Sequence, residues 1–293
     1  MLDTTLKAQN KKVLLTVLGT VQDAGSPQMA CQKSCCANLS EAEMSRRMES
    51  SLALTIDNNS AYLFDASPAI ADQFYSLQKQ GVSDLAGIFL THAHMGHYAG
   101  LLQLGREAWN SKQVAVFAMP RMAAFLQRNA PWEQLLRLEN IKINPLADQS
   151  PIAIEGGVRV TPIGVPHRDE YSETVAYWIQ GPSKSALYLP DIDKWERWET
   201  PIEEWIKKVD YAFLDATFFD GKELPNRSMA EIPHPFVVES INRFQKLKPT
   251  QKEKIYFIHL NHTNPLLNRN SEEYIQLSEK GFKVAERGLQ LSL

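Results

Sequence analysis

Histidines that come just after apolar segments are the residues of this 293-residue chain best suited to a chemical role. Six of the seven histidines lie at or just beyond the end of such a segment. His92, His94 and His97 follow one segment within six residues, and His167 and His259 follow two others. Side chains at strand ends converge on one edge of a sheet, where ligands bind. Since neutral imidazole is the commonest protein ligand for zinc and iron, these residues predict a metal-dependent site.

The elements that must hold the histidines are short apolar or β-branched runs that alternate with longer helical patterns. The runs predict strands over residues 13–18, 52–56, 61–64, 87–91, 114–118, 158–163, 175–179, 186–189, 211–214 and 255–258. The longer patterns predict helices over residues 68–80, 98–109, 121–129, 132–138, 201–208, 235–247 and 271–280. The first strand leads into residues 19–25, which lack the glycine-rich phosphate loop of a doubly wound sheet. The pattern therefore favours an α/β fold of four layers, an αββα sandwich.

The composition is that of an ordinary globular protein, with 44% hydrophobic and 22% charged residues. A net charge of -3 argues against non-specific nucleic-acid binding. No apolar run approaches the ~20 residues that span a bilayer. Residues 1–11 are polar and predict a flexible arm, and residues 12–293 predict one domain. We expect a cytoplasmic location, with a signal peptide removed before residue 1 as the open alternative.

The three cysteines, Cys31, Cys35 and Cys36, all lie within six residues. An odd number of thiols packed this closely makes a poor disulfide framework, because neighbouring cysteines bridge each other only with strain. Metal ligation or redox activity explains such a cluster better.

The histidine cluster also resembles a known motif. Residues 92–97 match the His-x-His-x-Asp-His motif of the metallo-β-lactamase superfamily at five of six positions, counting the variable ones. Asp65 resembles the early aspartate that orients the metal ligands, and His167 resembles the third histidine of the first metal site. Asp191 resembles the carboxylate that touches or bridges the metals, and His259 resembles the last histidine, a ligand of the second site. The resemblance implies a metal-dependent enzyme with the four-layer fold.

Four short segments narrow the resemblance to one branch of that superfamily. Residues 18–20, 26–28, 47–51 and 261–265 resemble pyrroloquinoline quinone biosynthesis protein B, to which phosphoribosyl cyclic phosphodiesterase is closely allied. In this branch an N-terminal cysteine cluster binds a structural zinc together with a histidine three residues after the last active-site histidine.

His262 stands three residues after His259 in this chain. The resemblance therefore implies a closed structural zinc site formed by two or three of Cys31, Cys35 and Cys36 with His262. The Cys-x3-Cys-Cys spacing differs from the tighter arrangement of the relatives, which leaves open which thiols bind. The alternative is a group of buried free thiols, with His262 as a hydrogen-bonding residue.

Gly96 occupies the position where the motif has an aspartate that binds the second metal. Loss of an anionic oxygen ligand weakens a site for a divalent cation. One interpretation is a single active-site metal with the ligands His92, His94, His167 and Asp191. The other adds a weakly bound second metal with the ligands His97, His259, Asp191 and water. Zinc fits as a Lewis acid, and iron or manganese are alternatives.

The function that we predict is hydrolysis of a phosphodiester or related ester by a metal-bound hydroxide. Asp191 would orient the hydroxide, and His234 would act as general acid or contact a phosphate, unless it is a surface-loop residue. The alternatives are a mononuclear iron oxygenase and a binding protein without catalysis. We expect a small, anionic substrate and no nucleic-acid or membrane partner. The sequence leaves the oligomeric state open, with a homodimer as one alternative.

Overall fold

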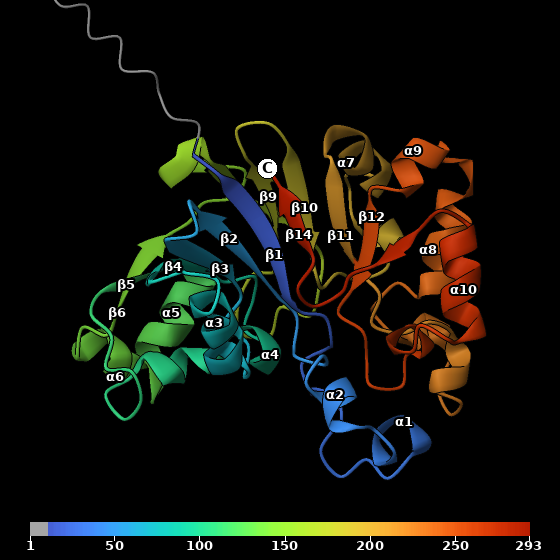
Figure 1. The fold of residues 1–293 in the computed structure, drawn as a ribbon, viewed down its shortest axis with the longest axis horizontal. Coiled ribbons are helices and arrows are strands. Elements are labelled where there is room, and N and C mark those ends of the chain that lie inside the picture. The colour runs from blue at the N-terminus through green and yellow to red at the C-terminus, as the bar shows by residue number, and fades with distance from the viewer. Residues whose placement is uncertain (1–10) are drawn as a thin grey trace, which may run out of the picture.

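The computed structural model describes residues 11–293, and within them it contains two seven-stranded sheets packed face to face (Figure 1). The first sheet has the order β14 (Gln290–Ser292), β1 (Val13–Gly19), β2 (Ser51–Ile56), β3 (Ser60–Phe64), β4 (Asp84–Phe89), β5 (Val114–Ala118) and β6 (Ile141–Pro145). The second has the order β13 (Lys283–Val284), β12 (Ile255–Ile258), β11 (Tyr211–Asp215), β10 (Ser185–Leu189), β9 (Val175–Gln180), β8 (Arg159–Gly164) and β7 (Ile152–Ala153).

Helices cover the outer faces of both sheets (Figure 1). In chain order the described helices are α1 (Ser34–Ala37), α2 (Glu41–Met44), α3 (Ile70–Gln78), α4 (Met95–Tyr98), α5 (Pro120–Arg128), α6 (Trp132–Arg137), α7 (Ile202–Lys208), α8 (Val237–Arg243), α9 (Pro249–Lys252) and α10 (Glu272–Glu279). Of these, α1 and α2 lie at one edge of the sandwich rather than on a sheet face (Figure 1). Leu77 of α3 and Leu126 of α5 are fully buried against the first sheet, and Ile206 of α7 is fully buried against the second. The layers are thus helix, sheet, sheet and helix, which confirms the predicted αββα sandwich.

Between the sheets lies a core of large apolar side chains. Phe64 and Phe89 of the first sheet meet Tyr177 of the second, with ring centroids 5.5 Å apart in each contact. Leu54 and Phe213 belong to the same fully buried cluster. Each large apolar side chain buried in this way stabilises the fold by about 1.5–3 kcal/mol. This core fixes the two sheets against each other, and with them the strand ends that carry the candidate site.

All ten predicted strands are confirmed, while β6, β7, β13 and β14 were not predicted. Three of these four strands have only two or three residues, too few to show an alternating pattern. The predicted helix over residues 98–109 is wrong: α4 is followed by a 3-10 helix, Ala99–Leu104. At Gly100 the chain packs closely against the loop after β3, and this contact replaces the regular helix. The amide of Gly100 donates to the carbonyl of Ala66, and a Cβ on Gly100 would lie only 2.0 Å from the carbonyl oxygen of Ser67.

The predicted arm over residues 1–11 lies, except for its last residue, outside the described residues. It stays a prediction, as does the assignment of residues 12–293 to one domain. Within the part of the chain that the structure describes, no helix combines the length and apolar character needed to cross a membrane.

Candidate metal centre

Parallel strands bring the candidate ligands to one edge of the sandwich. Asp65 directly follows β3, and His259 directly follows β12. Asp191 comes two residues after β10. β3 runs parallel to β4, and β10, β11 and β12 run parallel to one another. The carboxyl ends of these strands therefore deliver side chains from distant parts of the chain to one place, as the sequence predicted.

Asp65 is fully buried and fixes the orientation of His97. Its Oδ1 accepts hydrogen bonds from the amide and hydroxyl of Thr91, at 2.8 and 2.9 Å. Its Oδ2 lies 2.7 Å from Nδ1 of His97. A proton on Nδ1 leaves Nε2 of His97 free to face a metal, which is the usual role of such a carboxylate. Burial lowers the pKa of His97, but the carboxylates of Asp65 and Asp23 outweigh burial and raise this pKa well above its usual value. The surroundings of His97 therefore strongly favour a positive charge.

A first group consists of His92, His94 and His167, whose ligand atoms lie within 4.8 Å of one another. Nε2 of His92 and Nδ1 of His94 are 2.8 Å apart. Asp191 Oδ1 lies 3.6 Å from Nε2 of His167. Burial, aided by the nearby His97, holds the pKa of His92 well below its usual range. His92 is therefore a neutral imidazole, the form that binds a metal.

A second group consists of Asp23, His97, Asp191 and His259. Oδ2 of Asp191 lies 2.9 Å from Nε2 of His97 and 3.1 Å from Nε2 of His259. Oδ1 of Asp23 lies 3.0 Å from the same atom of His97 and 3.2 Å from that of His259. Ligand atoms around a tetrahedral zinc lie about 3.3 Å apart, given bonds of 2.0–2.1 Å. The four residues thus have the spacing of a metal's ligand set.

Several atoms of these groups are buried without a hydrogen-bond partner among the described residues: His97 Nε2, His167 Nδ1, His167 Nε2 and Asp191 Oδ2. His97 Nε2 and Asp191 Oδ2 are close, but they are not aligned for a hydrogen bond. A buried polar atom without a partner costs about 1–3 kcal/mol. A cation bound in each of the two groups would satisfy three of these four atoms, so the donor set fits a metal.

His234 lies inside the site rather than on a surface loop. Its Nδ1 is 2.8 Å from Oδ2 of the fully buried Asp215 and 3.5 Å from Oδ1 of Asp191. Burial opposes the charge on His234, but Asp215 outweighs it and raises the pKa of His234 to about 9. The imidazole is therefore protonated at neutral pH, as a proton donor must be.

Asp215 is itself held by the amides of Thr217 and Ile192, at 2.9 and 3.1 Å. Neither Asp215 nor Asp23 was among the residues predicted for the site. The position of Asp215 at the end of a predicted strand was a signal for it. Asp23 had no such signal, because its contact with His259 joins residues 236 positions apart.

The three cysteines and His262 form a separate cluster, with ligand atoms within 4.8 Å of one another. Sγ of Cys35 lies 3.9 Å from Sγ of both Cys31 and Cys36. Sulfur atoms around a tetrahedral zinc lie about 3.8 Å apart, given Zn–S bonds of 2.3 Å. Of the three thiols only Cys36 is buried, which does not match the alternative of a buried trio. The spacing fits zinc, with all three thiols within reach.

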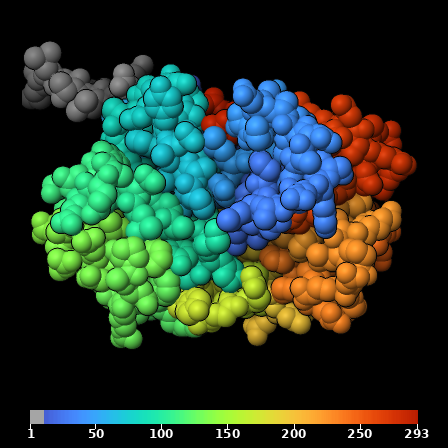
Figure 2. Space-filling model, turned by 90° about the horizontal axis from the view of Figure 1, so that it is seen from below, coloured from blue at the N-terminus to red at the C-terminus, as the bar shows by residue number. Residues whose placement is uncertain are grey.

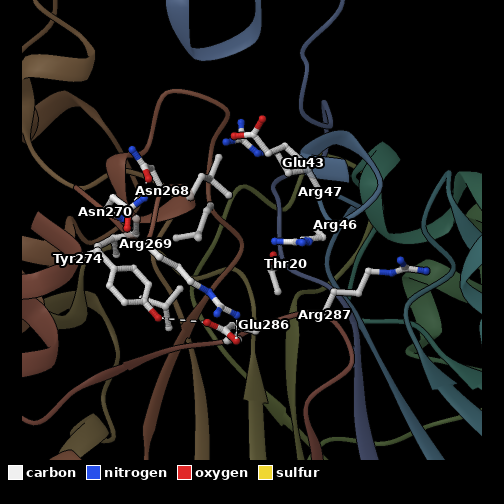
Figure 3. Close-up of a pocket in the computed structure, with 15 residues that line it drawn as sticks. Thr20, Glu43, Arg46, Arg47, Asn268, Arg269, Asn270, Tyr274, Glu286 and Arg287 are labelled. Carbon is white, nitrogen blue, oxygen red and sulfur yellow. Dashed lines mark hydrogen bonds and ion pairs between the residues drawn. The ribbon is translucent and has the colours of Figure 1, made fainter. Parts of the chain in front are cut away.

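A cavity of about 320 Å³ lies apart from both clusters, between α2 and the C-terminal segment (Figure 3). Arg46, Arg47, Arg269 and Arg287 line it together with two glutamates. Arg269 pairs with Glu286, and Arg287 donates to the carbonyl of Ser45 at 2.9 Å. None of the predicted ligands lines this cavity, so it does not belong to the metal centre.

Comparison with known proteins agrees with this geometry. The family model described as "Beta-lactamase superfamily domain" matches residues 61–260. Coenzyme PQQ synthesis protein B of Ruegeria pomeroyi is 26% identical over 308 residues, which cover 95% of this chain and 99% of that protein. These matches confirm the resemblance seen in the motifs.

Solved structures agree on the fold. Zn²⁺-bound PqqB from Methylobacterium extorquens superposes with a TM-score of 0.78 at 24% identity and covers 96% of this chain and 100% of its own. A diphosphatase from the PhnP family superposes with a TM-score of 0.69 at 22% identity, and the match covers 96% of this chain and 97% of the diphosphatase. Both share the sandwich described above.

Proposed function

We propose that this chain, which belongs to the beta-lactamase superfamily, is a metal-dependent hydrolase that cleaves a small anionic phosphodiester or related ester. The observation that carries the proposal is the buried set of histidines and carboxylates around Asp191, whose orphaned atoms face one another. Burying such polar atoms without partners lowers the free energy of unfolding, unless a cation binds between them.

The first metal would be bound by His92, His94, His167 and Asp191, and a second by His97, His259 and Asp191. Zinc is the ion that we propose, because imidazole with one carboxylate suits it. Iron and manganese remain alternatives with the same ligands. A metal so bound supplies Lewis acidity and generates a nucleophile from water near neutral pH.

Asp191 joins the two groups. Its Oδ2 faces His97 and His259, while its Oδ1 faces His167 and His234. Burial raises the pKa of Asp191, but His259, His97 and the other imidazoles outweigh this effect and hold it well below its usual range. The carboxylate therefore stays ionised and can orient a nucleophile between the groups.

His234 would protonate the departing oxygen of the substrate. It lies beside the oxygen of Asp191 that faces the first group, and Asp215 keeps its Nδ1 occupied. With Nδ1 occupied in this way, the proton given to the ester would be the one on Nε2 of His234. General acid catalysis of this kind contributes about 10²–10⁴-fold.

The thiol cluster would bind a structural zinc, closed to substrate. Four protein ligands leave no open position for chemistry. Because Cys31, Cys35 and Cys36 lie near the N-terminus and His262 near the C-terminus, such a zinc would join both ends of the chain.

An iron-dependent oxygenase is the second candidate, and one observation favours it. The curated relative is named for coenzyme PQQ synthesis and matches 95% of this chain. That name denotes a biosynthetic role rather than hydrolysis, and three imidazoles with one carboxylate also suit iron.

Metal analysis combined with turnover separates the two candidates. Protein purified without added metal is analysed for zinc, iron and manganese, and is then assayed with bis(p-nitrophenyl) phosphate. Zinc in the active site with turnover supports the hydrolase. Iron at about one per chain without turnover contradicts it and favours the oxygenase.

A further inference from the structure

We infer that Asp23, on the loop after β1, is a ligand of the second metal and takes the place of the aspartate that the motif lacks at Gly96. The inference rests on the proposed metal centre but not on the reaction that it catalyses. It changes the expected second site from a weak set of three protein ligands to a complete set of four.

The position of the carboxylate is the first argument. Oδ1 of Asp23 lies 3.0 Å from Nε2 of His97 and 3.2 Å from Nε2 of His259. Those two nitrogens also lie within 3.1 Å of Asp191 Oδ2. Only 13% of the Asp23 side chain is exposed, although it belongs to a loop near the N-terminus. Asp23 thus supplies the anionic oxygen that the second site otherwise lacks.

Gly96 is the second argument. A Cβ built on Gly96 would lie 2.3 Å from Oδ1 and 2.6 Å from Cα of Asp23. Asp23 therefore fills the space into which a side chain at position 96 would project. Glycine is unfavourable inside a helix such as α4, and its φ here does not demand it. What requires glycine at position 96 is the presence of Asp23.

The backbone around Asp23 is fixed independently of any metal. Val21 forms parallel bridges with both Glu49 and Leu260. The amide of Gln22 donates to the carbonyl of Leu260 at 2.9 Å, and the amide of Leu260 donates to Thr20 at 2.8 Å. Because Leu260 directly follows His259, these bonds hold Asp23 and His259 side by side. A ligand set that is organised before the metal arrives binds it more tightly.

The same loop continues into the thiol cluster. Asp23 is eight residues before Cys31, and His259 is three residues before His262. Figure 2 shows this N-terminal segment, in blue, on the face of the molecule between the green and orange parts. The segments that follow β1 and β12, which hold Asp23 and His259, therefore also lead to the proposed structural zinc.

The test is a titration of the demetallated protein with Zn²⁺, followed by calorimetry and by elemental analysis after desalting. We expect Asp23→Asn to contain one fewer tightly bound zinc than the wild type, or to bind the last zinc at least about tenfold more weakly. Asp57→Asn makes the same chemical change on the remote β2–β3 turn and is expected to leave the titration unchanged. Asp23→Asn with the wild-type number and affinity overturns the inference.

A second pair of variants tests the exchange of position. Gly96→Asp alone is expected to lose stability, because its side chain meets Asp23. Asp23→Gly combined with Gly96→Asp removes the side-chain clash but keeps the Cα of residue 23 at 2.6 Å from the new Cβ, so we expect it to regain only part of the stability lost in Gly96→Asp. A double variant no more stable than Gly96→Asp contradicts the idea that the Asp23 side chain excludes a side chain at position 96. Since the zinc titration reads metal binding, absence of phosphodiester turnover in the wild type would overturn the proposed function and leave this inference standing.

Discussion

The metal centre and the thiol cluster are built in opposite ways. Most ligands of the metal centre extend from buried strands, and the side chains of His97, Asp191 and His259 are only 1–2% exposed. The thiol cluster lies on short helices and loops, and two of its three thiols are partly exposed. The candidate metal centre is thus shaped by the apolar core, whereas the thiol cluster has little core of its own and would depend on the proposed zinc.

The strongest test of this difference between the two regions is to remove one ligand from the metal centre. We expect His92→Ala to lower turnover by at least about 10³-fold, because the nucleophile is no longer generated. The melting temperature should shift little, since the strands around the centre keep their core. Turnover is measured with bis(p-nitrophenyl) phosphate beside the melting curve. Unchanged turnover would refute the role of His92, and unfolding would refute the independence of fold from metal.

The matching change in the thiol cluster should have the reverse effect. We expect Cys31→Ser to remove one zinc per chain and to lower the free energy of unfolding by about 3 kcal/mol, because loss of a structural metal is among the severe changes. Elemental analysis and urea unfolding report the two effects. Ser34→Ala, in the adjacent α1, is the control and should change neither. Wild-type zinc content and stability in Cys31→Ser would exclude a structural zinc.

Within the metal centre, a substitution of His234 can separate proton donation from metal binding. We expect His234→Gln to lower kcat about 10²-fold for an ester with a poor leaving group. A p-nitrophenolate leaving group needs no proton, so kcat for that ester should change much less. The zinc content should match the wild type. Equal losses for both esters would contradict a general-acid role.

The smallest expected effect concerns Glu223, which lies in the segment after β11 and contacts the residue after His262. Glu223 accepts a hydrogen bond from Thr263 at 2.9 Å, next to His262. Burial raises the pKa of Glu223 to about 7 from an ordinary value of 4.5. The folded protein therefore binds an extra proton between about pH 4.5 and 7, so stability falls as pH rises through this window and then levels off.

Glu223→Gln removes this titration while it keeps a donor and an acceptor. We expect the variant to be at least about 1 kcal/mol more stable than the wild type at pH 8, of the ~3 kcal/mol that a pKa shift from 4.5 to about 7 represents, and close to it at pH 4.5. Urea unfolding at both pH values checks the difference. A gain that is equal at both pH values would show that burial of the charge is not its cause.

Apolar runs and histidine spacing predicted the layered fold and a metal site at the strand ends, while Asp65 and Asp191 were predicted only from the resemblance to a known family. The strands are read from local patterns, and His92, Asp191 and His259 are tied to strand ends in the sequence itself. Asp23 could not be predicted, because its place depends on pairing between Val21 and Leu260, which no local pattern encodes. The same limit explains the failed helix over residues 98–109, where a tertiary contact at Gly100 overrides helical periodicity.

The pairing of the two chain ends also sets an order of assembly during translation. β1 pairs with β14, with Leu14 opposite Ser292, and Val21 in the loop after β1 pairs with Leu260. Contacts this distant form late, and a chain still on the ribosome can pair β1 with β2 but still lacks β14 and Leu260. His92 and His94 are synthesised together and can meet early, whereas Asp23 meets His259 only when the chain is nearly complete. A chain that stops before His259 would therefore hold at most the first proposed metal, and the second set of ligands is complete only once residue 259 has been synthesised.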